Sequence, residues 1–295
     1  MIILMPKVVF VILHYLTIDV TMQCIKSIEN YITYDNYKIV VVDNGSNNQT
    51  GEQLSKTFKD NKYIEIIRLD DNLGFSTGNN AGYSYAKEKL HADYVIVINN
   101  DTEMIQKDFV QKAIQCFENE KYYVLGPDII NLEGTHQSPQ RDHIITKSET
   151  YRWYIKRCLF SKYLHLHRIL KLSNSFFILR KYLEHDENRK KSLVTDKKKE
   201  SVELQGACFI FSPLYIAESK FAFEELTFMY GEEALLALRC AKNQWKILYN
   251  PDLKIKHAEK ATMSIINKNL LEKEIFWSDN HVKAIKAILR KVRSY

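Results

Sequence analysis

Two adjacent carboxylates, Glu232 and Glu233, follow the apolar run 228–230, where the pattern predicts the start of a helix. The helix macrodipole favours anions at this position, so a charged first turn explains the pair on structural grounds alone. Beside an apolar surface, the same carboxylates could also supply a general base. The residues themselves leave both interpretations open.

A second candidate site is Asn99-Asn100-Asp101, which ends the apolar run 93–99. Alternation along a strand points Asn99 and Asp101 to the same side. Oxygen ligands spaced in this way suit a hard divalent cation that bridges a diphosphate, although an Asp after a strand can also cap a helix. His257 ends another predicted strand, so it could face the same cleft as Asp101.

Three of the nine glycines, at 74, 78 and 82, recur at four-residue spacing and would share one face of a helix. A glycine costs roughly 1 kcal/mol in a helix interior, so a compensating contact is expected. Close approach of another backbone, of a phosphate-bearing ligand, or tight helix packing alone would each compensate. The pattern differs from the dinucleotide-binding G-x-G-x-x-G and does not follow a strand directly.

These residues lie within repeated strand–helix units. Apolar runs predict buried strands at 7–13, 37–43, 63–69 and 93–99, with helices at 17–31, 73–90 and 108–118. The repeat predicts an α/β fold, with a mostly parallel sheet and helices on both faces. Ligands of such sheets bind beyond the carboxyl ends of the strands. Polar clusters follow four strands, at His14-Tyr15, Asp43 to Asn47, Asp70 to Asn72, and Asn99 to Asp101.

The later part of the chain continues the pattern after a different middle segment. A strand is predicted at 202–211, a helix at 231–243, strands at 245–249 and 253–257, and a final helix at 269–292. Composition is that of a globular protein, with 45% hydrophobic and 26% charged residues among 295, which excludes disordered, collagen-like and multi-span membrane classes.

Cysteine usage and the N-terminus bear on the compartment. Five scattered cysteines, an odd number without a C-x-x-C pair, argue against a disulfide framework or a zinc knuckle and fit a reducing cytosol. The apolar N-terminus is interrupted by Pro6 and Lys7, so a buried strand is expected rather than a signal peptide. No run approaches the roughly 20 apolar residues that cross a bilayer.

The middle segment carries the basic character of the chain. Residues 141–200 hold 16 Lys/Arg and 7 Asp/Glu, a balance of +9 within a net charge of +6. From 151 to 172, aromatic and aliphatic residues interleave with cations at helical spacing. Such a helix suits an anionic membrane interface. A helical subdomain packed on the core is the alternative, and Leu and Ile are too frequent for a nucleic-acid surface.

Five segments together resemble a family 2 glycosyltransferase, and most closely its bacterial rhamnosyltransferase and galactofuranosyltransferase branch. They are VVFVILHY, IVVVDNGSNN, DNLGFSTGNNAGYSYA, VINNDTEM and YGEEALLALRCAKNQWKILYNPDLKIKH. The resemblance covers residues 7–130 and 202–282, and it implies the GT-A fold. It divides the chain into a nucleotide-sugar-binding half (1–141), a basic helical insertion (142–200), an acceptor and catalytic half (201–262) and a C-terminal helix (263–295).

The resemblance also implies roles for individual residues. Asp43 matches an Asp that recognises a pyrimidine base, and Asn99 with Asp101 matches a metal-binding D-x-D whose first Asp is replaced. His257 matches a His that helps to hold Mg²⁺ or Mn²⁺, or the diphosphate. Glu233 matches the catalytic base of an E-D pair and Glu232 the Glu before it. The implied donor site further includes His14, Tyr15, Asn44, Asn72, Gly74, Gly78, Asn79 and Asn100.

The implied activity is inverting, metal-dependent transfer of rhamnose or another hexose from a dTDP- or UDP-sugar to a saccharide acceptor. The resemblance suggests a polyprenyl-linked acceptor, synthesis of bacterial capsule, O-antigen or exopolysaccharide, and a cytoplasmic enzyme held on the inner face of the plasma membrane. The alternatives are a non-catalytic membrane-surface or nucleotide-sugar-binding protein and a nucleotidyltransferase. The last would need an N-terminal Gly-rich phosphate loop, and residues 7–20 contain no Gly.

Overall fold

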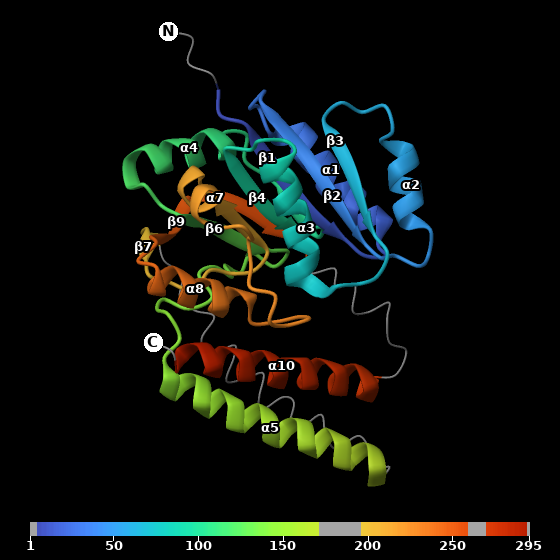
Figure 1. The fold of residues 1–295 in the computed structure, drawn as a ribbon, viewed down its shortest axis with the longest axis vertical. Coiled ribbons are helices and arrows are strands. Elements are labelled where there is room, and N and C mark those ends of the chain that lie inside the picture. The colour runs from blue at the N-terminus through green and yellow to red at the C-terminus, as the bar shows by residue number, and fades with distance from the viewer. Residues whose placement is uncertain (1–4, 171–195, 259–269, 294–295) are drawn as a thin grey trace.

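The computed structural model describes residues 5–170, 196–258 and 270–293. A central sheet carries helices on both faces, and two long helices lie side by side below it (Figure 1). The strands are β1 (Val8–His14), β2 (Tyr37–Asn44), β3 (Ile64–Leu69), β4 (Tyr94–Asn99), β5 (Thr102–Met104), β6 (Val124–Asn131), β7 (Lys199–Glu200), β8 (Cys208–Phe211) and β9 (Ile247–His257). The helices are α1 (Ile18–Tyr31), α2 (Thr50–Thr57), α3 (Gly74–Glu88), α4 (Phe109–Glu120), α5 (Lys147–Leu170), α7 (Pro213–Glu218), α8 (Glu232–Lys242) and α10 (Leu270–Val292).

The strand order is β3-β2-β1-β4-β8-β6-β9-β5, and β7 pairs with β9. The first four strands of this order are parallel, as the repeated strand–helix pattern predicts. Beyond β4 the sheet is mixed, because the chain re-enters between β4 and β6 from the opposite end and β8 is antiparallel to both. The carboxyl ends of β1, β2 and β4 therefore lie along the same edge of the sheet as the start of β8.

The central strands are buried on both faces, which explains their lack of polar alternation. On one face, Phe10 and Ile12 of β1 pack with Ile25 and Ile28 of α1. On the other, residues of β1 and β2 pack with Tyr83 of α3. Burying each such side chain contributes about 1.5–3 kcal/mol, so this three-layer core holds the edge of the sheet rigidly.

Two strand predictions differ from the structure: the strand predicted at 202–211 is confined to β8, Cys208–Phe211, and the two strands predicted on either side of Pro251 are one. The runs 245–249 and 253–257 form the single strand β9 rather than two strands. Its pairing with β6 shifts register, since Pro127 pairs with Asn250 and Asp128 with Lys254. Pro251 lacks an N–H for the ladder, so the chain bulges there and then resumes the same strand.

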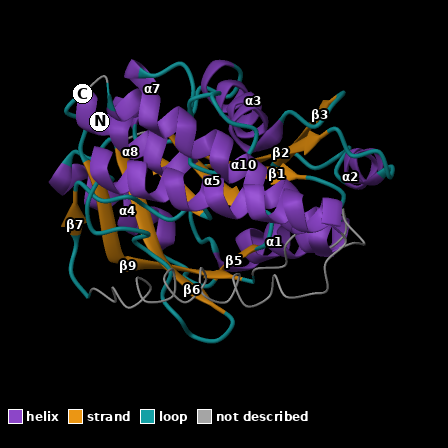
Figure 2. Ribbon diagram, turned by 90° about the horizontal axis from the view of Figure 1, so that it is seen from below, coloured by secondary structure: helices purple, strands orange, loops and turns teal. Residues whose placement is uncertain are grey.

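Helix α5, in the basic middle segment, packs on α10 (Figure 2). Phe160 and Leu164 of α5 are buried with Ile275 of α10, and Ile288 of α10 packs on Leu235 of α8. The packed alternative therefore holds for this face of α5. The bounds proposed for the insertion, 142–200, include residues 171–195, which lie outside the described part of the chain.

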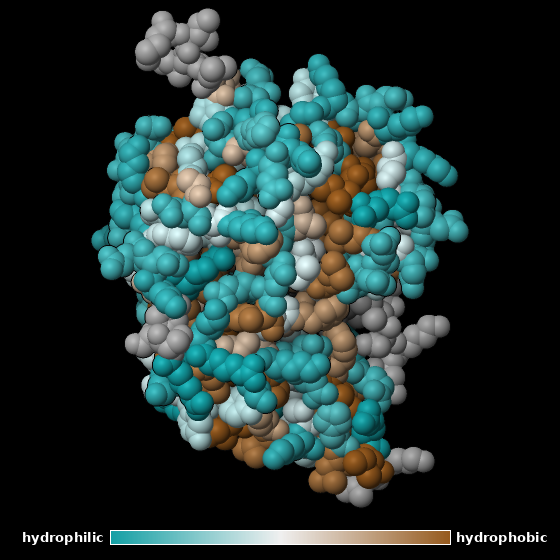
Figure 3. All heavy atoms as spheres, in the orientation of Figure 1, coloured by the Kyte–Doolittle hydropathy of each residue, from teal (hydrophilic) through white to brown (hydrophobic). Residues whose placement is uncertain are grey.

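The opposite face of α5 is exposed and apolar. Its large apolar residues are Tyr151, Ile155, Leu159, Leu166 and Ile169, and the side chain of Ile169 is 72% exposed. Apolar atoms gather at the lower rim of the molecule, where α5 lies (Figure 3). No helix within the described residues is long and apolar enough to span a membrane. We refer to these five residues as the outer stripe of α5.

Candidate active site

Asp43 lies at the carboxyl end of β2, beneath the first turn of α2. Its Oδ1 accepts a hydrogen bond from the Ser46 backbone N at 3.1 Å, and its Oδ2 is 3.6 Å from Arg68 Nε. A Cβ on Gly51 would lie 1.6 Å from Asp43 Oδ2, so only glycine leaves room for the carboxylate. Asp43 is 1% exposed, and its role in base recognition stays a prediction.

His14 ends β1 beside Asp43 and is fully buried. Its Nδ1 lies 2.8 Å from Thr21 Oγ1 and its Nε2 lies 2.9 Å from Thr50 Oγ1. Burial lowers the pKa of His14 to about 4, partly offset by the charge of Asp43, so the imidazole is neutral at pH 7. In this structure His14 contacts protein hydroxyls on both sides, and it can position Thr21 and Thr50 without touching a ligand itself. Tyr15, the next residue, is half-buried.

The network continues to the turn after β4. Asn100 Nδ2 donates to Thr17 Oγ1 and Thr21 Oγ1, both at 3.0 Å. Thr21 therefore bridges His14 and Asn100. One polar network therefore joins the end of β1, the first turns of α1 and α2 and the turn after β4.

Asn44 holds the loop that leads into α3. Its Nδ2 donates to Asn72 Oδ1 at 2.9 Å and to the Gly74 carbonyl at 3.1 Å, while its Oδ1 accepts from Leu73 N at 3.0 Å. Gly74 has a φ of +81°, and a Cβ there would lie 2.1 Å from the Phe228 carbonyl oxygen. Gly74 therefore permits a left-handed turn pressed against the segment that leads to Glu232.

The other two glycines of this run face the sheet. A Cβ on Gly78 would lie 2.6 Å from Leu13 Cδ1, and one on Gly82 would lie 2.4 Å from Val11 Cγ1. Helix packing thus supplies the expected compensation at both positions, and the donor-binding role of Gly78 stays a prediction. Asn79 is 1% exposed and its Nδ2 donates to the Phe75 carbonyl at 3.0 Å.

Asp101 and His257 meet at the edge of the sheet, as expected from their strand ends. Asp101 Oδ1 lies 3.2 Å from His257 Nε2, and the two side chains are 12% and 11% exposed. The backbone fixes this meeting, because Thr102 pairs with His257 across β5 and β9 and Ala258 N donates to the Asp101 carbonyl at 2.8 Å. His257 Nδ1 lies 2.9 Å from Gln137 Oε1.

The residues at this point fit a divalent cation that is also held by a diphosphate. The described residues contain no group of three or more His, Cys, Asp or Glu side chains arranged for a metal. They do bring together one carboxylate and one imidazole, with Asn99 two residues before Asp101. Mg²⁺ and Mn²⁺ accept this donor set when phosphate oxygens and water complete the coordination.

Glu232 and Glu233 begin α8, as predicted; Glu232 is buried and Glu233 is half-buried. Burial, and then the charge of Glu233, raises the pKa of Glu232 to about 8. Burial also raises the pKa of Glu233, whereas its own backbone N–H and Arg141 act in the opposite direction. A Cβ on Gly206 would lie 2.4 Å from Glu233 Oε1, so the Glu233 carboxylate rests against the backbone before β8.

A third carboxylate near this pair, Glu203, was missed by the sequence interpretation. It is 1% exposed, and burial and the charge of Glu233 raise its pKa to about 7 against the attraction of Arg141. Arg141 Nε lies 3.7 Å from Glu203 Oε2. A glutamate inside the apolar run 202–211 was the available signal, because buried carboxylates are rare unless paired.

The raised pKa of Glu232 makes folding stability depend on pH. The folded protein keeps a proton that the unfolded chain releases, so this contribution is complete below the unfolded pKa of 4.5 and is lost as pH rises through about 8. We expect the melting temperature to fall between about pH 5.5 and 8.5, and to fall less in Glu232→Gln. Circular-dichroism melts of both proteins test this, and equal falls would contradict it.

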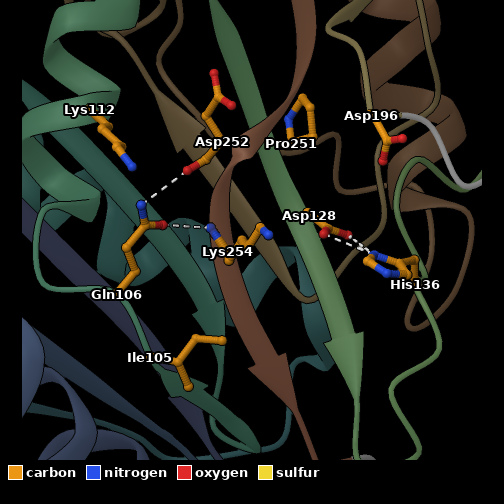
Figure 4. Close-up of a pocket in the computed structure, with 9 residues that line it drawn as sticks. All are labelled: Ile105, Gln106, Lys112, Asp128, His136, Asp196, Pro251, Asp252 and Lys254. Carbon is orange, nitrogen blue, oxygen red and sulfur yellow. Dashed lines mark hydrogen bonds and ion pairs between the residues drawn. The ribbon is translucent and has the colours of Figure 1, made fainter.

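A cavity of about 550 Å³ lies elsewhere, between β9, β6 and the start of α4 (Figure 4). Its lining is polar and of mixed charge, and it includes Lys112, Asp128, His136, Asp252 and Lys254. None of the predicted site residues lines it. We therefore assign the chemistry to the strand ends and not to this cavity.

Comparison with known proteins gives consistent results. The model of the family described as glycosyl transferase family 2 matches residues 10–185. A hexosyltransferase of low-salt glycan biosynthesis, Agl10 of Haloferax volcanii, is 31% identical over 113 residues, which are 38% of this chain and 35% of that protein. The dTDP-rhamnosyl transferase RfbF of Shigella flexneri is 30% identical over 104 residues, 35% of this chain and 33% of that protein. The matches thus span about a third of these relatives.

Solved structures share the fold at low sequence identity. GalNAc-T7 with UDP, GalNAc and Mn²⁺ aligns with 88% of this chain and 45% of its own, at a TM-score of 0.60 and 13% identity. Residues 1–349 of Staphylococcus aureus TarS with UDP-GlcNAc align with 94% of this chain and 65% of that chain, at a TM-score of 0.55 and 13% identity. These likenesses show the fold alone.

Proposed function

Because the chain belongs to glycosyl transferase family 2, we propose that it is an inverting, metal-dependent hexosyltransferase that uses a dTDP- or UDP-sugar. A rhamnosyl donor is one candidate, since RfbF is a dTDP-rhamnosyl transferase, and a UDP-hexose is the other, since the TarS structure holds UDP-GlcNAc. The acceptor is a saccharide of bacterial capsule, O-antigen or exopolysaccharide synthesis.

One observation carries the proposal: the Asp101–His257 pair and the half-buried Glu233 lie at the same edge of the sheet. Asn99 N donates to the Ala207 carbonyl at 3.0 Å where β4 pairs with β8. Gly206, the residue before Ala207, contacts the Glu233 carboxylate. Asp101 follows Asn99 by two residues and contacts His257. A sugar held by its diphosphate at Asp101 therefore has a proton acceptor nearby.

The residues of this chain divide the reaction between them. Glu233 accepts the proton of an acceptor hydroxyl whose oxygen bonds to the anomeric carbon, while the bond from that carbon to the diphosphate breaks and the diphosphate leaves with the electron pair. Attack from the opposite face inverts the anomeric centre. A bound Mg²⁺ or Mn²⁺ would neutralise charge on the leaving diphosphate. Asp101, Asn99 and His257 would hold that ion, and Asn44 and Asn72 shape the loop beside it.

The test is a donor screen that follows release of the nucleoside diphosphate. Purified protein is given dTDP-rhamnose or a UDP-hexose, Mn²⁺ and a panel of saccharide acceptors. Acceptor-dependent release of dTDP or UDP is expected with one donor class. Donor binding without release from any donor would favour the alternative, a non-catalytic nucleotide-sugar-binding protein. This alternative is tested because Asn99 and Glu233 stand where the family resemblance implies an Asp.

The same proposal includes a polyprenyl-linked acceptor, reached from the inner face of the plasma membrane. The outer stripe of α5 supports it, because this exposed apolar face lies beside the exposed cations Arg152 and Lys162. Apolar side chains at the acyl boundary with cations on anionic headgroups are the features of an interfacial helix. Each cation near the surface adds about 1 kcal/mol of attraction, weakened by salt.

We expect the protein to sediment with anionic vesicles at low salt and less with neutral ones. Replacing Leu159 and Ile169 by Glu should abolish this binding, because charges in the outer stripe would enter the acyl boundary. Leu132→Glu, at a residue that is 58% exposed on a different surface, is the matched control and should bind as wild type. Equal sedimentation of wild type and the double variant would contradict the membrane proposal.

A further inference from the structure

The segment 136–141, which we call the strap, runs from the cavity of Figure 4 to the buried carboxylates. At its first residue, His136 Nδ1 lies 2.8 and 2.9 Å from the two carboxylate oxygens of Asp128 (Figure 4). At the next residue, Gln137 N donates to the Ile129 carbonyl at 2.8 Å, and Gln137 Oε1 lies 2.9 Å from His257 Nδ1. The strap is therefore anchored on β6 and touches the imidazole at the cation site.

The other end of the strap is anchored on Glu203. Gln140 Nε2 donates to Glu203 Oε1 at 3.1 Å. Arg141 and Glu203 exchange two backbone hydrogen bonds, each of 3.1 Å, and the Arg141 guanidinium lies 5.4 Å from the centre of the Trp153 ring. One short segment thus contacts the surroundings of both the cation pair and the base.

The contact with Gln137 determines which nitrogen of His257 faces Asp101. Gln137 Oε1 contacts the Nδ1 side of the ring, so the opposite nitrogen, Nε2, is turned toward Asp101 Oδ1 at 3.2 Å. In this orientation Nε2 and the Asp101 carboxylate can both ligate one ion. The strap therefore acts as the hydrogen-bond partner that fixes the orientation of a ligating His.

The other end of the strap, where Arg141 contacts Glu203, lies near enough to Glu233 for their charges to interact. Glu203 is fully buried three residues before Gly206, against which the Glu233 carboxylate rests. Arg141 attracts both carboxylates, and the charge of Glu233 acts on Glu203. The Arg141–Glu203 pair, held by two backbone hydrogen bonds, therefore forms part of the charged surroundings of the Glu233 carboxylate.

We propose that the strap is a positioning element, in which Gln137 orients His257 toward the cation while Arg141 and Glu203 hold the environment of Glu233. This deepens the proposed function and rests on it, since it assumes a cation at Asp101 and a base at Glu233. Its consequence is that a change confined to one end alters either cation affinity or catalytic rate, whereas a change that loosens the whole strap alters both together.

The contact between Gln137 and His257 can be tested without sugar transfer. Calorimetric titration of Mn²⁺ into the protein in the presence of UDP measures the affinity for the ion. Gln137→Ala should weaken Mn²⁺ binding by about 10-fold or more, the usual effect of removing the partner of a ligating His. Gln137→Glu keeps an oxygen acceptor for Nδ1 and should restore the affinity. Gln111→Ala is the matched control and should bind Mn²⁺ as wild type does. Gln111 is an exposed glutamine of α4 whose side chain donates to Thr33 Oγ1 at 3.1 Å.

Steady-state kinetics test the second end and the coupling. Glu203→Gln should lower kcat without changing the Mn²⁺ affinity, because Glu203 anchors the end of the strap at Gln140 and Arg141 and not the end at Gln137. His136 anchors the strap through Asp128. Because His136→Ala removes this anchor, the variant should weaken Mn²⁺ binding and lower kcat together. A merely structural residue would lower the melting temperature alone.

The possible results distinguish the positioning role of the strap from the proposed glycosyltransferase activity. Wild-type Mn²⁺ affinity in both Gln137→Ala and His136→Ala would overturn the strap and leave the glycosyltransferase proposal standing. Failure of the wild-type protein to bind Mn²⁺ with UDP would overturn the cation assignment, and the strap with it. Weak binding in Gln137→Ala that Gln137→Glu restores would support the strap.

Discussion

Glu233→Gln is expected to lower kcat by about 10² or more, the scale of losing a general base. The amide keeps the shape of the side chain but cannot accept a proton from the acceptor hydroxyl. The dissociation constant of the donor should change little, because the Glu233 carboxylate rests against Gly206 and not against the strand ends that would hold the nucleotide. Release of nucleoside diphosphate measures the rate, and calorimetry measures donor binding.

Glu232→Gln is the matched control for this prediction. Glu232 is 5% exposed, and burial together with the charge of Glu232 raises the pKa of the neutral Tyr230 on the turn before α8. Glu233 is the residue that contacts Gly206 beside β8 and interacts with Arg141. The geometry thus favours Glu233 as the base. A large loss of rate in Glu232→Gln, with none in Glu233→Gln, would reverse the two roles.

The same carboxylate determines how the rate depends on pH. A general base must be ionised, and burial holds the pKa of Glu233 above its ordinary range. The acid limb of the wild-type profile should therefore lie above the value of about 4.3 typical of a free glutamate. The rate rises as pH rises through this limb, and a limb at the ordinary glutamate value would show that the base is exposed during turnover.

Much of the fold follows from local sequence patterns. The four predicted strands of the first half agree with β1 to β4 within a residue or two, because each is an apolar run long enough to cross a sheet covered on both faces. The final helix, predicted at 269–292, is α10 at Leu270–Val292. The five cysteines are free, as their number and spacing indicate.

The site was predictable only where it depends on strand ends. Asp101 lies in the turn directly after β4 and His257 ends β9, so their meeting could be inferred from pattern. Glu203 and Arg141 are 62 positions apart and belong to no local repeat, so only the pairing of their backbones reveals them. Burial of His14 between Thr21 and Thr50 likewise depends on three separate elements.

Asp101→Ala is expected to abolish transfer and to remove Mn²⁺-dependent binding of UDP. The described pair would lose its carboxylate, and a neutral Asn99 and an imidazole are weak ligands for a hard cation. Asp101→Asn should behave in the same way, because it keeps the shape and removes the charge. Its matched control is Asp108→Asn, where the exposed carboxylate pairs with Lys112 at 3.2 Å on α4.

The measurement is UDP affinity with Mn²⁺ and with a chelator, together with the rate of diphosphate release. Wild-type protein should bind UDP more tightly with Mn²⁺, whereas Asp101→Ala should give the same weak affinity in both conditions. The residual affinity reports the contacts at the ends of β1 and β2. Because Ala258 N donates to the backbone carbonyl of Asp101 and not to its side chain, the substitution should preserve the register of β5 with β9. Full activity of Asp101→Ala without added metal would therefore overturn the cation assignment and not merely reflect a misfolded site.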